Sequence, residues 1–219
     1  MKKKAMSSHE IQMSLFQRYP ELDVCRNDFE NAYHLLNDCY RKQGKVLFAG
    51  NGGSAADSEH IVAELMKSFL FSRKIDDRAE NVMEEQFGNA GKEISAKLEG
   101  ALPAIPLTSL SALTSAISND VNSEMVFSQM VYGYGKPGDV FFGISTSGNS
   151  PNIVNAMMVA KATGIATIAL TGKTGGKCKT LADVTICVPQ SETFQIQELH
   201  LPIYHALCAM LEADFFQEK

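Results

Sequence analysis

The sequence lacks several features that would place the chain in a specialised class of protein. No apolar run reaches the roughly 18 residues that a membrane-spanning helix needs. The start, Met-Lys-Lys-Lys, resembles the charged region of a signal peptide, but polar residues follow it in place of an apolar segment. None of the five cysteines forms a C-x-x-C pair, which favours reduced thiols over disulfides. We therefore expect a soluble cytoplasmic protein with no membrane contact.

The chain also lacks an excess of positive charge. It has 20 lysines and arginines against 25 aspartates and glutamates, which gives a net charge of −5. A nucleic-acid binder needs a basic face to replace the counterions that it releases, and no basic helix-turn-helix segment is evident before the first expected strand. We expect no nucleic-acid partner. A local cationic pocket for a phosphate remains compatible with this charge.

Short apolar segments alternate with helical ones over most of the chain. Residues 1–44 are expected to form a helical segment that breaks near Tyr19-Pro20. Residues 45–219 are expected to form an α/β domain, with a parallel sheet covered by helices on both faces and a long terminal helix over 192–216. The five expected strands span residues 45–49, 104–108, 140–144, 165–171 and 184–188.

One stretch departs from this alternation. Residues 70–100 are charged and mixed in character, and they are too many for an ordinary connection between a helix and a strand. We expect an insertion there that serves as a helical lid, a flexible arm or an oligomer contact.

The strongest indication of chemistry is the segment STSGNS at residues 145–150. It carries four hydroxyl groups, follows an expected strand and precedes an expected helix. Gly148 permits a tight turn, and the start of the helix offers free N–H groups and the positive end of the helix dipole. Serine and threonine also form ordinary caps and turns. Four hydroxyls after a buried strand nevertheless favour a phosphate site.

A second loop, GNGGS at residues 50–54, likewise follows an expected strand and precedes an expected helix. Its glycines let the backbone approach a ligand closely, and Ser54 could cap the next helix or bind a phosphate. The loop has neither the Gly-Lys-Ser/Thr of a P-loop nor the G-x-G-x-x-G order of dinucleotide binders, so we expect no nucleotide cofactor. Ligands of such folds bind beyond the carboxyl ends of the strands, where both loops lie.

His60 and Glu64 lie four residues apart on an expected helix, so they share one face. An imidazole beside a carboxylate suits proton transfer or metal binding, and a solvated surface pair is the alternative. In the terminal helix, Gln197 and His205 are eight residues apart, about 12 Å along the axis. They can meet one ligand if their side chains converge, if Pro202 kinks the helix, or if neighbouring subunits contribute.

Asn119 and Asp120 follow an apolar helix-like stretch. Both could bind sugar hydroxyls, and both are equally good turn residues.

Together these segments resemble the phosphoheptose isomerases, a branch of the SIS-domain superfamily. The ISTSGNS segment is specific to SIS-type sugar-phosphate proteins, and HIVAEL with IQE…H narrows the resemblance to the heptose branch. The segments follow the family's order and cover about residues 46–212, apart from the 70–100 insertion. They read NGGSAADSEHIVAEL, LPAIPLT, SND, GKPGDVFFGISTSGNSPN, ALTGKTGGK and IQELHLPIYHALC.

The resemblance implies a three-layer αβα fold and a homotetramer with active sites at subunit interfaces. It implies conversion of sedoheptulose 7-phosphate to glycero-manno-heptose 7-phosphate through an enediol, with Glu64 as the catalytic carboxylate and His205 as the catalytic imidazole. Zn²⁺, which some members hold, would fall on His60, Glu64, Gln197 and His205. The substrate-binding candidates are Asn51, Gly52, Gly53, Ser54, Asn119, Asp120 and Gln197, with Ser145, Thr146, Ser147 and Ser150 at the phosphate.

Three features depart from the family's pattern. Where the family has Gly-Arg after Glu-Leu, this chain has Met66-Lys67-Ser68, and an ammonium presents a different donor geometry from a guanidinium. The family's Arg-Ile-Gln-Glu begins here with Gln195, which Phe194 precedes. The 70–100 segment is longer than the family's connection. Each change touches a ligand or interface region, so the identity of the sugar is the least determined part of the expectation.

Three other functions fit parts of the pattern. A non-catalytic branch of the fold binds the bacterial replication initiator, but it lacks the residues that Glu64 and His205 match. A sugar-phosphate-sensing regulatory module would need a DNA-binding segment. An isomerase that acts on another sugar phosphate is compatible with both the insertion and Lys67.

Overall fold

A five-stranded parallel sheet in the order β2-β1-β3-β4-β5 runs through the computed structural model, which describes residues 6–217. The edge strand β2 pairs with β1 alone, an edge position that agrees with the donor missing from Pro106. Val46 lies opposite both Ala104 and Val140, which fixes the register of the sheet. The strands are β1 (Val46–Ala49), β2 (Ala104–Pro106), β3 (Val140–Ser145), β4 (Ala166–Thr171) and β5 (Val184–Cys187), so the expected five-stranded parallel sheet is confirmed.

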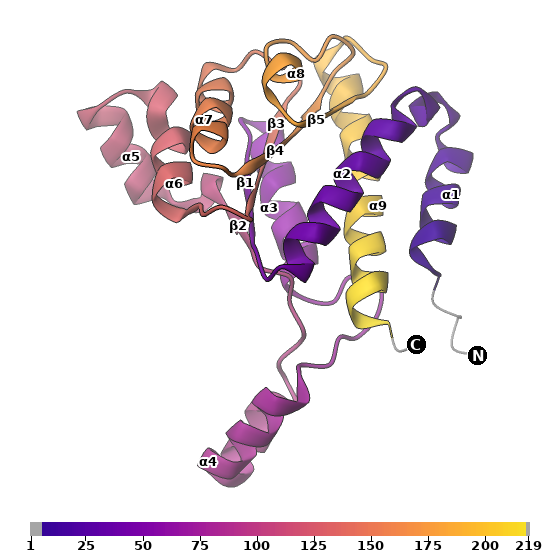
Figure 1. Ribbon diagram of the computed structural model, residues 1–219, viewed down its shortest axis with the longest axis vertical. Coiled ribbons are helices and arrows are strands. Elements are labelled where there is room, and N and C mark those ends of the chain that lie inside the picture. The colour runs from indigo at the N-terminus through magenta and orange to yellow at the C-terminus, as the bar shows by residue number, and fades with distance from the viewer. Residues whose placement is uncertain (1–5, 218–219) are drawn as a thin grey trace.

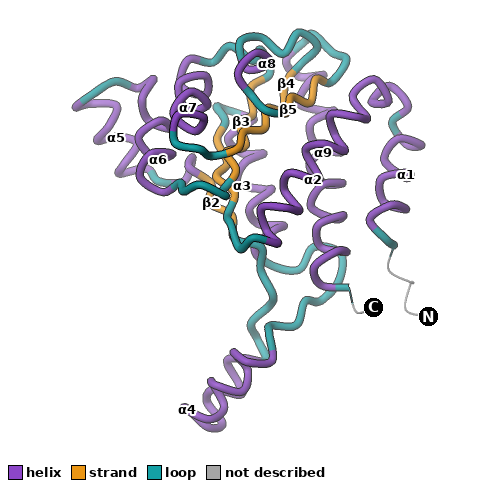
Figure 2. The backbone as a smooth tube through the Cα atoms, in the orientation of Figure 1, coloured by secondary structure: helices purple, strands orange, loops and turns teal. Residues whose placement is uncertain are grey.

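Helices cover both faces of this sheet (Figure 1; Figure 2). One face packs against α2 (Arg26–Arg41), α3 (Gly53–Met66) and α9 (Thr193–Phe216), and the other against α6 (Val126–Tyr134) and α7 (Pro151–Ala162). Strand side chains alternate between the faces because successive residues of a strand point in opposite directions. Phe48 and Phe142 therefore enter the first core, while Leu47 and Phe141 enter the second.

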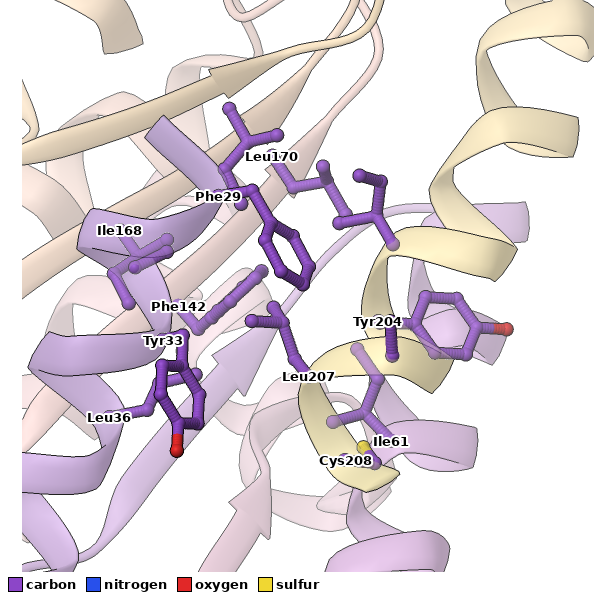
Figure 3. Packing of buried hydrophobic residues seen from close by; sticks show 14 of the residues in the cluster. Phe29, Tyr33, Leu36, Ile61, Phe142, Ile168, Leu170, Tyr204, Leu207 and Cys208 are labelled. Atoms are coloured by element: carbon purple, nitrogen blue, oxygen red, sulfur yellow. The ribbon is translucent and has the colours of Figure 1, made fainter. Parts of the chain in front are cut away.

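The larger core lies between the sheet and the helices α2, α3 and α9, as Figure 3 shows. Phe29 and Leu36 reach into it from α2, and Leu207 reaches into it from α9. Phe29 is fully buried, and burying such a side chain stabilises the fold by about 1.5–3 kcal/mol. Ile61 of α3 belongs to the same core, which therefore helps to fix the position of this helix.

The remaining helices complete the chain. α1 (Ser8–Arg18) begins with a capping box between Ser7 and Glu10 and packs against α9. It ends just before Pro20, where the sequence predicts a break. No helix of the described residues is long and apolar enough to cross a membrane. The other short elements are η1 (Pro20–Cys25), η2 (Leu107–Ser109), α5 (Ser111–Asp120), η3 (Ser123–Met125) and α8 (Cys178–Leu181).

The insertion forms an arm that projects from the body (Figure 1). Its helix, α4 (Asp77–Ser95), contains a break at Gly88, where φ is 56° and ψ is −133°. A side chain at Gly91 would come within 1.9 Å of the Met83 carbonyl oxygen, so the chain folds back on itself and needs a glycine there. Four large apolar side chains between residues 77 and 98 of the arm are exposed, namely Val82, Phe87, Ile94 and Leu98.

The base of the arm is held by a buried arginine. Arg73 donates from Nη2 to the Glu64 carbonyl and from Nη1 to the Leu65 carbonyl, each at 2.7 Å, and from Nε to Glu212 at 2.8 Å. The Glu212 carboxylate also accepts hydrogen bonds from two backbone N–H groups of the arm's first connection, at residues 69 and 70. The pair therefore ties the arm to the ends of α3 and α9.

We predict that Glu212→Ala lowers the free energy of unfolding by about 3–5 kcal/mol, because it leaves the Arg73 guanidinium buried without its carboxylate. Urea denaturation at fixed protein concentration measures the change. Asp77→Ala is the control, because it removes an exposed partner of Lys74 and should leave the denaturation midpoint unchanged. Equal midpoints for Glu212→Ala and the wild type would show that the buried pair does not hold the fold.

Candidate active site

A cavity of about 350 Å³ lies beyond the carboxyl ends of β1 and β3. Both polar loops that the sequence singles out contribute to it, and α9 closes one side. This is the edge at which ligands bind in open parallel sheets. The cavity is lined by Asn51, Gly52, Gly53, Ser54, Ile144, Ser145, Thr146, Ser150, Thr193 and Gln197.

The loop after β3 owes its shape to Gly148. Its φ of +64° lies in the left-handed region, and a side chain there would come within 2.0 Å of the Gly175 carbonyl oxygen. The Ser145 and Ser150 hydroxyls lie 3.0 Å apart across the turn. Ser150 directly precedes α7, where Pro151 has no N–H and the Ile153 N–H already donates to Asn152 Oδ1 and to the Ser150 carbonyl, so the Asn152 N–H is the donor left at this helix start. The loop therefore offers hydroxyls and backbone donors to an anion without a cationic side chain.

The two loops are joined by an amide pair that the sequence does not reveal. Asn51 Nδ2 donates to Asn152 Oδ1 at 3.0 Å, and Asn152 Nδ2 donates to Asn51 Oδ1 at 2.9 Å. This reciprocal bond holds the starts of α3 and α7 beside the same cavity. Asn152 occupies the second position of α7, where a polar residue looks like part of an ordinary helix start.

Gln197 brings α9 into the cavity. A side chain added to Gly53 would come within 2.4 Å of Gln197 Nε2, so the glycine leaves space for this amide at the start of α3. The helix continues through Pro202, and Gln197 and His205 both lie on it. Gln197 thus lines the cavity formed by the two polar loops, which we call the anion cavity. His205 lies two turns further along α9.

A second group of polar side chains lies where α3 and α9 pack together. His60 Nε2 lies 3.1 Å from Glu64 Oε1, and His60 Nδ1 lies 3.1 Å from the Tyr204 hydroxyl. The rings of His60 and His205 meet edge to face with centroids 5.0 Å apart. The structure therefore brings His60, Glu64 and His205 together, and we call these three residues the acid–base cluster.

The surroundings of this cluster favour a neutral imidazole. Partial burial and the neighbouring His60 lower the pKa of His205, and Glu64 opposes them. The Nε2 atom of His205 is buried without a hydrogen-bond partner in the described part of the chain. Lys67 Nζ lies 3.9 Å from Glu64 Oε2, so the lysine at the family's arginine position lies close to the carboxylate that is expected to be catalytic.

The cavity and the acid–base cluster lie at different positions along the axis of α3. Ten residues separate Ser54 from Glu64, which corresponds to about 15 Å along the helix axis. Neither Glu64 nor His205 lines the cavity. A site that used both groups would therefore join halves that one chain places apart.

Known proteins resemble this chain in sequence and in fold. The SIS domain family matches residues 79–172. The phosphoheptose isomerase of Sulfurimonas denitrificans is 36% identical over 216 residues, which cover 99% of this chain and 95% of that protein. This chain belongs to the phosphoheptose isomerase family. The phosphoheptose isomerase of Aneurinibacillus thermoaerophilus is 40% identical over 83% of this chain and 79% of its own. The GmhA structure from Neisseria gonorrhoeae matches with a TM-score of 0.68 and 33% identity, covering 90% of this chain and 91% of that one.

Three residues that the resemblance to the phosphoheptose isomerases predicts to bind substrate lie outside the cavity. The Ser147 hydroxyl accepts a hydrogen bond from the Asn149 N–H at 3.1 Å and so closes its own turn. Asn119 and Asp120 lie exposed at the end of α5, where Asn119 Nδ2 donates to Asp120 Oδ1 at 2.8 Å. Their roles in substrate binding stay predictions.

The expected zinc ligands do not converge on one point. Within residues 6–217, no group of three or more histidine, cysteine, aspartate or glutamate side chains is arranged to hold a metal ion. His60 Nε2 is directed at Glu64 Oε1, and Gln197 lies against Gly53. In this arrangement the four side chains do not fit a metal ion. The proton transfers that we propose for this site use no metal.

We predict that Ser150→Ala weakens the binding of inorganic phosphate by about tenfold or more, because a hydrogen bond to a charged ligand is worth about 1.5–3 kcal/mol. Titration calorimetry measures the dissociation constant. Ser147→Ala is the matched control from the same loop, and it should have the smaller effect because its hydroxyl already accepts a bond from Asn149. A larger loss for Ser147→Ala would show that the phosphate lies outside this cavity.

Proposed function

We propose that this chain is an aldose–ketose isomerase that converts sedoheptulose 7-phosphate to glycero-manno-heptose 7-phosphate. The observation that carries the proposal is the acid–base cluster of His60, Glu64 and His205 in a chain of the phosphoheptose isomerase family. The hydroxyl-lined cavity supplies a place for the phosphate group. A non-catalytic adaptor has no need of such a cluster, so this arrangement favours an enzyme.

The proposed reaction moves one proton between C1 and C2 of the sugar. Glu64 removes a proton from C1 of the ketose while His205 donates a proton to the C2 carbonyl oxygen, which forms an enediol. His205 then takes the proton of the O1 hydroxyl, and Glu64 returns its proton to C2. The products are the C1 aldehyde and the two side chains in their starting states.

The surroundings of His205 suit this exchange between two oxygens. A neutral imidazole has one N–H donor and one acceptor nitrogen, so it can give a proton to O2 and take one from O1. The lowered pKa of His205 keeps this form populated near neutral pH. The phosphate, held by the loops at residues 51–54 and 145–150, positions the reacting carbons without taking part in the proton transfer.

We further propose a homotetramer in which the cluster of one chain completes the cavity of another. The separation of the two halves along α3 supports this arrangement. The arm supports it too, because its exposed apolar side chains, Val82, Phe87, Ile94 and Leu98, suit a contact between subunits.

We also propose a cytoplasmic location, and Zn²⁺ binding in a rearranged form of the site, because the four expected ligands do not fit the ion as they lie in this structure. All five cysteines are free, which agrees with a reducing compartment. Two imidazoles and a carboxylate are donor types that zinc accepts, but His60 and Glu64 would have to exchange their mutual contact for the ion. Metal analysis of the purified protein tests whether zinc is present.

We predict that Glu64→Gln lowers kcat by about 10²–10⁴-fold, the usual contribution of a positioned acid–base group. The assay uses a panel of ketose phosphates of five to seven carbons, each with and without a chelator. We expect the seven-carbon substrate to be converted fastest by the wild type.

Glu59→Gln is the control for this variant. Glu59 lies on the same helix, is exposed, and accepts a hydrogen bond from Thr108 away from the cluster. It should retain wild-type turnover. Unchanged turnover in Glu64→Gln would exclude Glu64 as the base, and failure of the wild type to convert any member of the panel would overturn the proposed function.

We predict that mixing two inactive variants restores activity. Thr146→Glu places a carboxylate in the anion cavity, and Glu64→Gln removes the base. If each site combines the cavity of one chain with the cluster of another, about one quarter of the sites in randomly mixed oligomers contain two intact halves. Activity is measured after the variants are unfolded together and refolded, with each variant treated alone as the control.

Each outcome of the mixing experiment is decisive. Recovery of about a quarter of wild-type activity supports a site shared between subunits. Absence of recovery, with oligomers of normal size by light scattering, would show that both halves of each site come from one chain.

A further inference from the structure

A chain of hydrogen bonds extends from the catalytic cluster to a residue that has no assigned role. The Tyr204 hydroxyl donates to Asp57 Oδ1 at 3.2 Å and lies 3.1 Å from His60 Nδ1. His60 Nε2 in turn lies 3.1 Å from Glu64 Oε1. Asp57, His60 and Glu64 share one side of α3, and Tyr204 reaches them from α9.

The donor and acceptor groups in this series of hydrogen bonds allow only one direction of donation. An ionised carboxylate accepts hydrogen bonds only, so the single proton of the Tyr204 hydroxyl goes to Asp57. The hydroxyl oxygen can then accept a bond from the His60 Nδ1–H. This leaves Nε2 as the atom that faces Glu64.

Packing alone does not account for the Tyr204 hydroxyl. The tyrosine is 2% exposed, and its ring packs edge to face against both His60 and His205. Its hydroxyl, however, is directed away from the surrounding core side chains (Figure 3). A phenylalanine would fill the same space, so the oxygen serves the polar contacts with Asp57 and His60.

We propose that Tyr204, held by Asp57, is a positioning residue that sets the ring of His60 so that Nε2 faces Glu64. Without the hydroxyl, Nδ1 has no partner and the ring can turn about its bond to the Cβ atom. The Glu64 carboxylate then loses the contact that holds it in place. The catalytic meaning of this arrangement rests on the proposed function, in which Glu64 is the base.

The first test is Tyr204→Phe. We expect kcat to fall by about tenfold to a hundredfold with KM unchanged, because a small misplacement of a catalytic group has an effect of this size. Tyr33→Phe is the matched control, because Tyr33 also donates its hydroxyl to an aspartate, Asp214, but away from the cluster. It should retain the wild-type kcat.

Two variants of Asp57 separate its charge from its role as acceptor. Asp57→Asn keeps an oxygen that can accept the Tyr204 proton and should retain kcat within about threefold of the wild type. Asp57→Ala removes the acceptor and should lower kcat as Tyr204→Phe does. Tyr204→Phe and Asp57→Ala interrupt the same series of hydrogen bonds. The kcat of the double variant that combines them should therefore be no lower than that of the slower single variant.

A crystal structure of Tyr204→Phe gives a readout that does not depend on activity. We expect the His60 ring to turn and the Nε2 to Oε1 distance to lengthen beyond hydrogen-bonding range. A His60 ring that stays in place, or a Tyr204→Phe enzyme with wild-type kcat, would overturn the proposal. If the wild type converts no sugar phosphate, the proposed function fails, but the orientation of His60 in the variant still tests the role of Tyr204.

Discussion

The parallel packing of α3 on α9 is the contact on which the rest of this molecule depends. At one end it places Gln197 against Gly53, beside the anion cavity. In the middle it brings His60 to the ring of His205. At the far end, the Arg73–Glu212 pair ties both helices to the arm. A shift of one helix along the other by a single turn, about 5.4 Å, would disturb all three groups together.

Much of the fold could be predicted because it follows from local patterns. Buried strands of a parallel sheet are short apolar runs, and Val140–Ser145 is buried throughout. Pro106 suits the edge strand β2 because proline has no N–H to donate to a neighbouring strand, which is a local property of the residue. The 70–100 insertion was predicted as a helical lid, a flexible arm or an oligomer contact, but its shape could not be predicted, because it depends on the reversal at Gly88 and on the close contact of Gly91 with Met83.

Part of the candidate site could likewise be predicted from local sequence patterns, and part of it could not. The loops around Ser54 and Ser150 could be predicted because four hydroxyls after a buried strand favour a phosphate site over an ordinary turn, and because a second glycine-containing loop follows another strand. Asn152, Asp57 and Tyr204 could not, because each takes its meaning from a partner that the fold supplies. The bond from Tyr204 to Asp57 joins residues 147 positions apart, and only the packing of α3 on α9 brings them together.

The separation of the anion cavity from the acid–base cluster bears on substrate choice. The cavity offers hydroxyls and backbone donors, which recognise a phosphate whatever sugar carries it. In the proposed reaction, the cluster acts on the first two carbons, whatever lies beyond them. In an assembled site, the distance between these halves would therefore select the length of the sugar. Lys67 and the base of the arm adjoin the cluster, so the departures from the family lie where that distance and the contacts to the sugar's hydroxyl groups would be set.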